Sequence, residues 1–290
     1  MKKKRLIIKQ TNPLGVLLLI LFALAFIAGI VLLSISLLAR YSNAKETLFQ
    51  NRNSILDAKH DTETAIFNCI APYHSIPKRF PKNLQHLSIQ KRKKLFIHTM
   101  LPIAFKVKSE FDKEHSLIEN IKTKLEKGLK LTDYEKKELK QSMKRYKTQN
   151  IYELVKRADS VPVSIIIAQA GIESGWGSSR FSKIYNNPYG LHRKYVKPYK
   201  PIVRSFKSLY DATVAYVMNI NTSFAYEKFR NARYMMQKMR NPYKLAEYLS
   251  MYSTKREQYT LLIQKVISSN ALFLYDMYDL HRIMNIQCQR

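Results

Sequence analysis

Apolar and polar positions divide the chain into one N-terminal apolar run and a long region with the period of helices. Residues 14–39 are 26 consecutive residues without a charge. As a helix rising about 1.5 Å per residue, this run can cross a hydrocarbon layer of roughly 30 Å with some tilt. Residues 1–13 carry five Lys or Arg and no acid, a bias that keeps such a flank in the cytoplasm. We therefore predict that residues 14–39 form a single transmembrane anchor.

A cleavable signal peptide is the alternative interpretation of the same run. Ser42-Asn43-Ala44 has the small-x-small form of a cleavage site, which would release a protein that begins at Lys45. The apolar run is about twice as long as the hydrophobic segment of a usual signal peptide, which favours an uncleaved anchor. Residues 40–89 are polar and end in a proline-containing stretch, so we predict a tether with an extended end.

Beyond residue 89 the pattern is helical almost throughout. It predicts a buried helix that is kinked or broken before Pro102, because proline lacks the backbone N–H that a helix interior uses. Thr132 and Glu135 have the spacing of a capping box and predict the start of a later helix. We expect residues 90–158 to pack as a helical region on the lobe that follows. The helices predicted there are 90–108, 110–127, 132–147 and 151–158.

Residues 159–285 are the second lobe. Ser160-Val161-Pro162 is a good helix start, and that helix runs to about residue 174. Residues 175–207 are rich in glycine, asparagine and proline, so they predict a loop with at most a small β-hairpin near 189–193 and 202–206. Helices resume at Ser208, and further ones are predicted near 224–239, 242–251 and 255–270. The fold class predicted is α+β and mainly α.

The chain is strongly basic, with 50 Lys and Arg against 21 Asp and Glu and a formal charge of +29. Such a charge is typical of nucleic-acid-binding proteins, but the predicted anchor places most of the chain outside the cytoplasm. The sequence also lacks RNP-like, helix-turn-helix and zinc-finger patterns. We therefore expect no nucleic-acid partner and instead anionic lipid head groups or an acidic wall polymer. A generally basic composition without a dedicated partner is the alternative.

Cysteine and histidine suggest little chemistry. Cys69 and Cys288 could pair in an oxidising compartment or remain two separate thiols. The seven histidines are scattered, and neither His-Glu-x-x-His nor Cys-x-x-Cys occurs. We therefore predict no metal site and no cofactor.

The carboxylates after position 160 are few, and most have an ordinary explanation. Asp211 has capping-box spacing from Ser208, and Glu257 has it from Thr254. Only Glu173 lacks such an explanation. The others lie among basic residues or near the C-terminus and are expected to be solvated: Glu227, Glu247, Asp276 and Asp279.

Glu173 is the single acid between Asp159 and Asp211, and it follows an apolar helical stripe. The negative end of the helix dipole and the apolar surroundings both favour its neutral form. A glutamic acid that stays protonated near neutral pH can donate a proton to a leaving oxygen, which is the general-acid role in glycoside hydrolysis. The alternative is a helix-terminal Glu that points into water.

Two stretches carry a family resemblance, ESGWGSSRF at 173–181 and NNPYG at 186–190. They resemble the signature of the bacterial glucosaminidase domain, glycoside hydrolase family 73 within the lysozyme-like superfamily. The resemblance covers about residues 72–280 and extends to one subfamily, the Bax proteins. It implies a lysozyme-like helical lobe with a small β-element beside the cleft. It also implies an endo-β-N-acetylglucosaminidase that cuts peptidoglycan at the β-1,4 bond after N-acetylglucosamine.

The resemblance assigns roles to particular residues. Glu173 takes the place of the catalytic acid, and Tyr252 that of the tyrosine in the family's C-terminal Tyr-Ser motif, which faces the cleft. Together with the anchor, the resemblance places the catalytic domain in the periplasm of a bacterium, on a single-pass protein of the inner membrane whose N-terminus is cytoplasmic. The residues expected to contact peptidoglycan are Gln169, Ser174, Trp176, Asn187, Tyr189 and Gly190.

One departure from the family bears on mechanism. Many members carry a second carboxylate in the β-element, but residues 174–210 contain no Asp or Glu. We therefore expect a single general acid assisted by the substrate's own 2-acetamido group. The alternatives are a lytic transglycosylase or muramidase on the same fold, and a wall-binding protein with weak catalysis.

Overall fold

The computed structural model describes residues 76–192, 202–237 and 240–277. The chain divides into two compact units, Met1–His60 and Asp61–Arg290, and every described residue belongs to the second. The predicted anchor at 14–39 and both cysteines lie outside the described residues. Within the described ranges, no helix combines the length and the apolarity that a membrane span requires.

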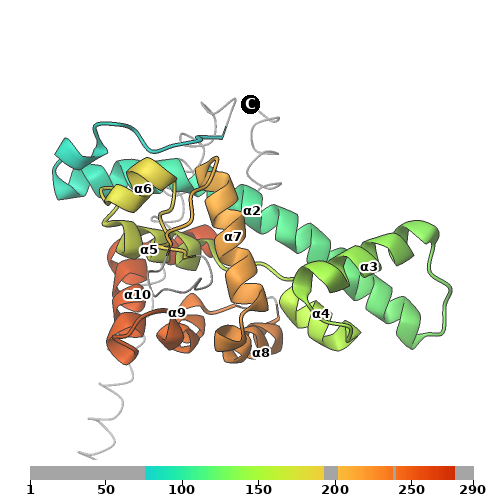
Figure 1. The fold of residues 1–290 in the computed structure, drawn as a ribbon. Coiled ribbons are helices and arrows are strands. Elements are labelled where there is room, and N and C mark those ends of the chain that lie inside the picture. Colours follow the sequence, from blue (N-terminus) through green and yellow to red (C-terminus); the bar gives the residue numbers. More distant parts are fainter. Residues whose placement is uncertain (1–75, 193–201, 238–239, 278–290) are drawn as a thin grey trace, which may run out of the picture. The chain divides into compact units, whose positions relative to one another are not determined.

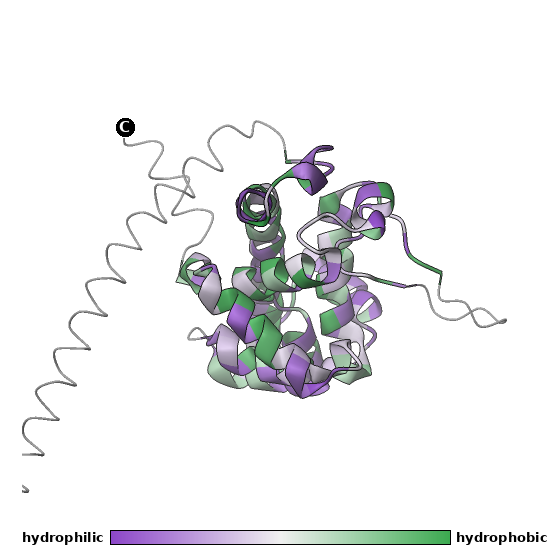
Figure 2. Ribbon diagram, turned by 90° about the vertical axis from the view of Figure 1, so that its left-hand side faces the viewer, coloured by the Kyte–Doolittle hydropathy of each residue, from purple (hydrophilic) through white to green (hydrophobic). Residues whose placement is uncertain are grey.

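The described part of the chain is built of helices joined by short loops (Figure 1). Most of its helices carry both polar and apolar residues (Figure 2), as expected where one side of a helix faces a core. In chain order the elements are η1 (Leu84–His86), α2 (Ile89–Glu126), α3 (Asp133–Tyr146), α4 (Ile151–Arg157), α5 (Val163–Ser174), α6 (Arg180–Tyr185), α7 (Leu209–Thr222), η2 (Phe224–Tyr226), α8 (Glu227–Met236), α9 (Pro242–Ala246), η3 (Glu247–Tyr252), α10 (Glu257–Ser269) and η4 (Leu272–Met277).

Helix α2 is continuous through Pro102, so a break before this residue is ruled out. An interior proline costs a helix about 3 kcal/mol. Burying a large apolar side chain contributes roughly 1.5–3 kcal/mol, and Phe96, Met100, Leu101 and Phe105 are each at most 1% exposed. Packing on both sides of the proline therefore outweighs its cost. The resulting helix of 38 residues packs against α3, α4, α5 and α7.

Helix α5 is the most buried helix of the described chain. All residues from Val163 to Gly171 are buried, which is the pattern of a helix enclosed by its neighbours. It packs against α2, α10 and η4. Its N-cap, Pro162, has no side-chain acceptor for the free N–H groups of the first turn.

Asp276 supplies that acceptor from η4. It accepts hydrogen bonds from the backbone N–H of Ser164, at 3.0 Å, and from the Ser164 hydroxyl. Burial raises the pKa of Asp276 to about 6, although the hydrogen bonds from Ser164 act in the opposite direction. The expectation that Asp276 is solvated is therefore wrong, because the start of a buried helix needs an acceptor.

The capping predictions had mixed outcomes. Thr132 and Glu135 form the predicted capping box of α3, and Ser208 accepts from the backbone N–H of Asp211 at the start of α7. The box predicted between Thr254 and Glu257 is wrong. Helix α10 begins at Glu257, and its N-cap is Arg256 in a left-handed conformation, with φ 48° and no side-chain cap.

Residues 175–192 contain a helix that the sequence pattern did not predict. Helix α6 forms there, because Ser179 accepts from the backbone N–H of Ser182 and Asn186 ends the helix with φ 49°. The β-element of the described residues is one antiparallel bridge between His192 and Val203. This pairing agrees with the two predicted hairpin segments, and the residues that connect them, 193–201, lie outside the described part.

A buried ion cluster joins the start of α5 to α8. Asp159 is 2% exposed, and its carboxylate lies 3.3 Å from Nε of Arg233 and 2.8 Å from Nη2 of Arg240. Burial alone would raise the pKa of Asp159, but the two guanidinium groups outweigh it and hold this pKa below its ordinary value. Burial lowers the pKa of Arg233 to about 10, so this residue also stays charged at neutral pH.

The variant Asp159→Asn should lower the free energy of unfolding by about 3–5 kcal/mol, because it leaves buried guanidinium charge without a counterion. Asp133→Asn, which removes an almost fully exposed acid from α3, should leave it nearly unchanged. Since the folded pKa of Asp159 lies below the unfolded value of about 3.9, its stabilisation is present above that value and is lost as the pH falls. Urea denaturation at pH 7 and at lower pH measures both effects, and equal losses in the two variants would contradict the prediction.

Candidate active site

Glu173 lies in the last turn of α5, as the sequence predicts, and its side chain is half-buried. Gly175 ends the helix with φ +56°. Oε1 of Glu173 accepts a hydrogen bond of 2.7 Å from the hydroxyl of Tyr259 in α10. Gly190, at φ +63°, lies on the other side, where an added Cβ would stand 3.9 Å from Oε2. The carboxyl group is therefore held between α10 and the turn that precedes the β-bridge.

Burial raises the pKa of Glu173 above its ordinary value, and the hydrogen bond from Tyr259 offsets part of this effect. Burial acts on the charged form because an apolar setting solvates a carboxylate poorly. The hydroxyl of Tyr259 acts in the opposite direction because it donates to the carboxylate. The net result is an acid that keeps its proton closer to neutral pH than a solvated glutamate does.

Tyr259 is the last donor in a buried hydrogen-bonded chain. Tyr216 in α7 donates to Oε1 of Gln169, and Nε2 of Gln169 donates to the Tyr259 hydroxyl at 2.9 Å. Gln169 is fully buried one turn before Glu173. Each side chain in this series orients the next one through a hydrogen bond. The series therefore determines the direction from which Tyr259 approaches Glu173.

Tyrosine rings form the wall around this chain. The rings of Tyr189 and Tyr216 stack with centroids 4.2 Å apart, and those of Tyr252 and Tyr259 lie parallel at 5.8 Å. Tyr226 packs against Tyr252 at 6.1 Å, and the Glu173 carboxylate adds to the burial that raises the pKa of Tyr226 to about 12. These hydroxyls stay protonated at neutral pH, so they act as hydrogen-bond donors and not as charges.

Tyr252 contacts the site through the backbone of the 187–190 turn. Its hydroxyl donates to the carbonyl of Tyr189 at 2.8 Å, and the Tyr189 hydroxyl is 3.1 Å from the hydroxyl of Thr213. Tyr252 therefore ties η3 to the turn that carries Gly190, and its ring supports Tyr259.

Three of the predicted contact residues lie in or beside the turns before and after α6. The hydroxyl of buried Ser174 donates to the Ala170 carbonyl and accepts from Gly177 N. The amide of buried Asn187 bridges both sides of the β-element, because Nδ2 donates to the carbonyls of Leu191, at 2.8 Å, and Arg204, at 3.0 Å. Trp176 is the third, in a left-handed conformation with φ 58°.

The indole of Trp176 lies toward α2 and not toward α10. Its ring meets Phe96 edge-on at 5.6 Å, and Nζ of Lys93 is 5.0 Å from its centroid. A Cβ at Gly171 would stand 3.0 Å from the indole, so Gly171 is needed for this close approach. Of the residues predicted from sequence, the structure therefore gathers Gln169, Glu173, Tyr189, Gly190 and Tyr252 around one point, and sets Trp176 apart.

Tyr216, Tyr226 and Tyr259 belong to the site and were missed by sequence reasoning. The chain holds 19 tyrosines, and their spacing alone does not distinguish these three. Tyr259 carries no local signal either, because the backbone between Tyr252 and α10 is not helical and the two residues do not share a helix face.

Four other carboxylates either interact with residues outside the site or are exposed to solvent. Asp211 accepts from the Ser208 hydroxyl at the start of α7, and Glu247 pairs with Lys244 at 3.3 Å. Glu227 and Glu257 are exposed in the first turns of α8 and α10. The influences that set the pKa of Glu173 are burial and Tyr259, with no second carboxyl among them. Within the described ranges there is also no group of three His, Cys, Asp or Glu that could hold a metal ion.

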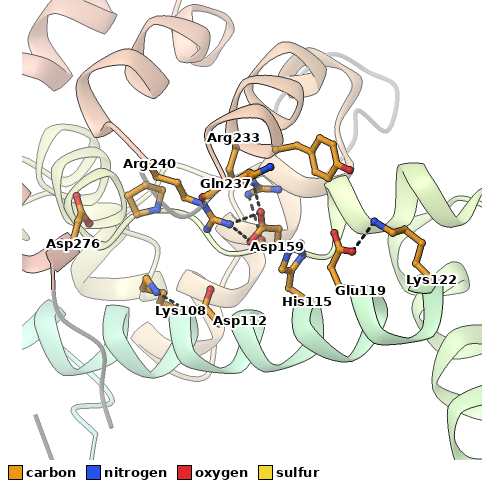
Figure 3. A pocket seen from close by; sticks show the side chains of 12 residues that line it. Lys108, Asp112, His115, Glu119, Lys122, Asp159, Arg233, Gln237, Arg240 and Asp276 are labelled. Carbon is orange, nitrogen blue, oxygen red and sulfur yellow. Dashed lines mark hydrogen bonds and ion pairs between the residues drawn. The ribbon is translucent and has the colours of Figure 1, made fainter. Parts of the chain in front are cut away.

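A second polar feature lies at the opposite end of α5. A pocket with a volume of about 610 Å³ lies between α2 and the region of Arg233 and Arg240. Figure 3 shows its lining side chains, with Asp159, Arg233 and Arg240 among them. Asp276, which caps the start of α5, also lines it. Glu173 is at the other end of this helix of 12 residues, so the pocket is separate from the candidate active site.

Comparisons with known proteins show what the chain is similar to. Residues 148–272 match the glucosaminidase family, described as mannosyl-glycoprotein endo-beta-N-acetylglucosaminidase. The chain is 30% identical over 188 residues to "Protein bax" of Escherichia coli (strain K12), an alignment that covers 58% of this chain and 66% of that protein. The chain thus spans just under two thirds of that relative's length.

No solved structure matches the chain significantly, so the lysozyme-like arrangement and the domain limits expected from the sequence stay predictions. The family match does include Glu173, Tyr252 and Tyr259. It also includes α5, α7 and α10, which position these residues. Residues 148–272 thus resemble a glucosaminidase domain, and over 58% of its length the chain is similar to the Bax protein.

Proposed function

We propose that this protein is a peptidoglycan hydrolase, an endo-β-N-acetylglucosaminidase in which Glu173 is the general acid. The observation that carries the proposal is the half-buried Glu173 carboxyl with its raised pKa, held by Tyr259 at 2.7 Å beside Gly190. Such a group donates a proton to a glycosidic oxygen as the bond to the anomeric carbon breaks. The family match supplies the substrate class, a glycan that contains N-acetylglucosamine.

The reaction needs a nucleophile besides the acid. Residues 174–210 contain no Asp or Glu, so in our proposal the carbonyl oxygen of the sugar's own 2-acetamido group attacks the anomeric carbon. The leaving sugar departs with the proton from Glu173. Water then opens the cyclic intermediate and gives a proton back to the Glu173 carboxylate, so the acid is regenerated. Because this route uses one carboxylate twice, it fits a site with one acid.

Tyr259 serves this cycle as a positioning residue. Its hydroxyl donates to Oε1, which leaves Oε2, on the Gly190 side, as the oxygen that carries and returns the proton. The chain from Tyr216 through Gln169 fixes this donor. Tyr252 orients the turn of Gly190 through its bond to the Tyr189 carbonyl.

The proposed location is the bacterial inner membrane, with residues 14–39 as an uncleaved anchor, a cytoplasmic N-terminus and the catalytic domain in the periplasm. The apolar run and its basic flank support this location. A lytic transglycosylase or muramidase is the second candidate, because it also works with one glutamate. A reducing N-acetylglucosamine end on the released sugars supports our proposal, whereas an anhydro-muramyl end supports the transglycosylase.

Glu173→Gln should reduce turnover of purified peptidoglycan by about 10²–10⁴-fold, because the amide keeps the shape of the side chain but has no proton to transfer. Glu247→Gln is the matched control, since Glu247 is an exposed acid in η3 paired with Lys244. Zymography and reducing-end assays measure both variants. Circular dichroism should show an unchanged fold, and normal hydrolysis by a folded Glu173→Gln variant would overturn the assignment.

Neutralising any one of four other acids of the domain should cost less than about tenfold in rate, since these four cap helices or lie in solvent. Tyr252→Phe should cost more than any of them, because it releases the turn that carries Gly190. Rates with peptidoglycan measure each variant. If one of the four neutralised acids gives a folded variant that is as inactive as Glu173→Gln, that acid is the general base and substrate assistance is ruled out. The acids to neutralise singly are Asp211, Glu227, Glu247 and Glu257.

Tyr259→Phe should move the alkaline limb of the kcat/KM profile to higher pH. The hydroxyl of Tyr259 lowers the pKa of Glu173, so its removal raises that pKa further and the acid stays protonated to a higher pH. Tyr252→Phe removes a hydroxyl that donates to a backbone carbonyl and should lower the rate without moving the limb. An alkaline limb that stays in place in Tyr259→Phe would show that Tyr259 does not set the titration of Glu173.

A further inference from the structure

Helix α3 carries a groove of about 450 Å³ on its outer side. A partly apolar floor and a basic rim characterise this α3 groove. Its lining residues are Lys136, Leu139, Lys140, Met143, Lys144 and Gln149.

The rim consists of three lysines at successive i,i+4 positions, Lys136, Lys140 and Lys144, and all three are exposed. Side chains at this spacing lie one above the other on a helix, and like charges there destabilise it. Lys136 pairs with Asp133 at 2.9 Å. Lys140 and Lys144 make no ion pair with any residue that the structure describes, and no acid lines the groove. The ridge is therefore positive and largely uncompensated.

The floor consists of Leu139 and Met143. Both side chains are partly buried and pack against the hydrophobic core, so their place between the lysines is fixed by the fold. A ligand that fits this groove has negative charge near the rim and apolar groups within reach of the floor. A free phosphate or a sugar acid satisfies only the first requirement.

The polar pocket beside α2 provides a contrast. There Lys122 pairs with Glu119 at 2.7 Å, and Arg233 and Arg240 pair with Asp159. Charge in that pocket is balanced by the protein itself, whereas the α3 groove leaves its charge for a ligand. Figure 1 shows α3 beside the C-terminal part of α2, away from α5 and α10, so the groove is not part of the Glu173 site.

We propose that the α3 groove binds the anionic head group and the upper acyl region of phospholipids, so that α3 rests on an anionic bilayer surface. The lysine rim contacts lipid phosphates, and the long apolar stems of the lysines, with Leu139 and Met143, contact the carbon atoms below them. This inference concerns a different surface from the proposed catalysis and does not depend on it.

The test uses the full chain reconstituted in vesicles of phosphatidylcholine, with or without phosphatidylglycerol at about one third of the lipid. Hydrogen–deuterium exchange of the α3 backbone is the readout, because docking restricts the local opening that exchange requires. Exchange across 136–149 should slow several-fold when phosphatidylglycerol is present. This readout is local, so membrane attachment through any other segment does not produce the difference.

The triple variant K136Q/K140Q/K144Q should exchange at the same rate in both kinds of vesicle. The matched control K228Q/K255Q/K265Q loses the same charge from exposed lysines elsewhere and should keep the difference. Met143→Ser should reduce it without a change of charge. Peptidoglycan hydrolysis by the triple variant in detergent should equal that of the native chain, so a failed catalytic assignment and a failed docking proposal can be told apart.

Three outcomes would overturn the proposal. The native chain could exchange equally in both kinds of vesicle, or the triple variant could keep the full difference. Slower exchange in neutral vesicles on addition of polyglutamate, with no effect of phosphatidylglycerol, would instead identify an acidic polypeptide as the partner.

Discussion

Helix α5 is enclosed on almost every side and yet ends in an ionisable group, Glu173, whose side chain is only half-buried. Nine consecutive residues, Val163–Gly171, are buried, so the helix cannot shift without disturbing α2, α10 and η4. The start of the helix carries free N–H groups that require an acceptor. Asp276, which is distant in the sequence, provides this acceptor. Its end carries Glu173, where Gly175 and the turn after it break the helix. The rigidity of the helix thus fixes the place of the acid.

The two ends of α5 deal with buried polarity in different ways. At the start, the Asp159 cluster keeps its charges because opposite charges lie within ion-pair distance. At the end, no cation of the described residues influences Glu173, and neutral tyrosine hydroxyls lie around it instead. A neutral neighbourhood leaves the proton on the acid, whereas a cationic one would remove it. Among the residues that the structure describes, the absence of Lys and Arg from the influences on Glu173 is therefore as important as the presence of Tyr259.

Much of the helical layout and the central acid could be predicted from the sequence, since helix period, the Thr132–Glu135 box and the isolation of Glu173 are local signals. The errors fall where distant residues decide. Pro102 stays helical because buried neighbours on both sides outweigh its cost, and Asp276 is drawn to a helix start 112 residues away. Tyr259 meets Glu173 from another helix, and Trp176 turns toward α2 because Gly171 leaves room for its indole. No local pattern contains these partners.

Trp176 also gives the protein an intrinsic optical probe. It is the only tryptophan of the chain, its backbone N–H donates to the Gly171 carbonyl at 2.8 Å, and its indole packs over Gly171 on the side away from the tyrosine wall. A displacement of the last turn of α5 would therefore change the indole's contacts with Phe96 and Lys93. Fluorescence emission from unlabelled protein thus reports on the backbone that carries the acid.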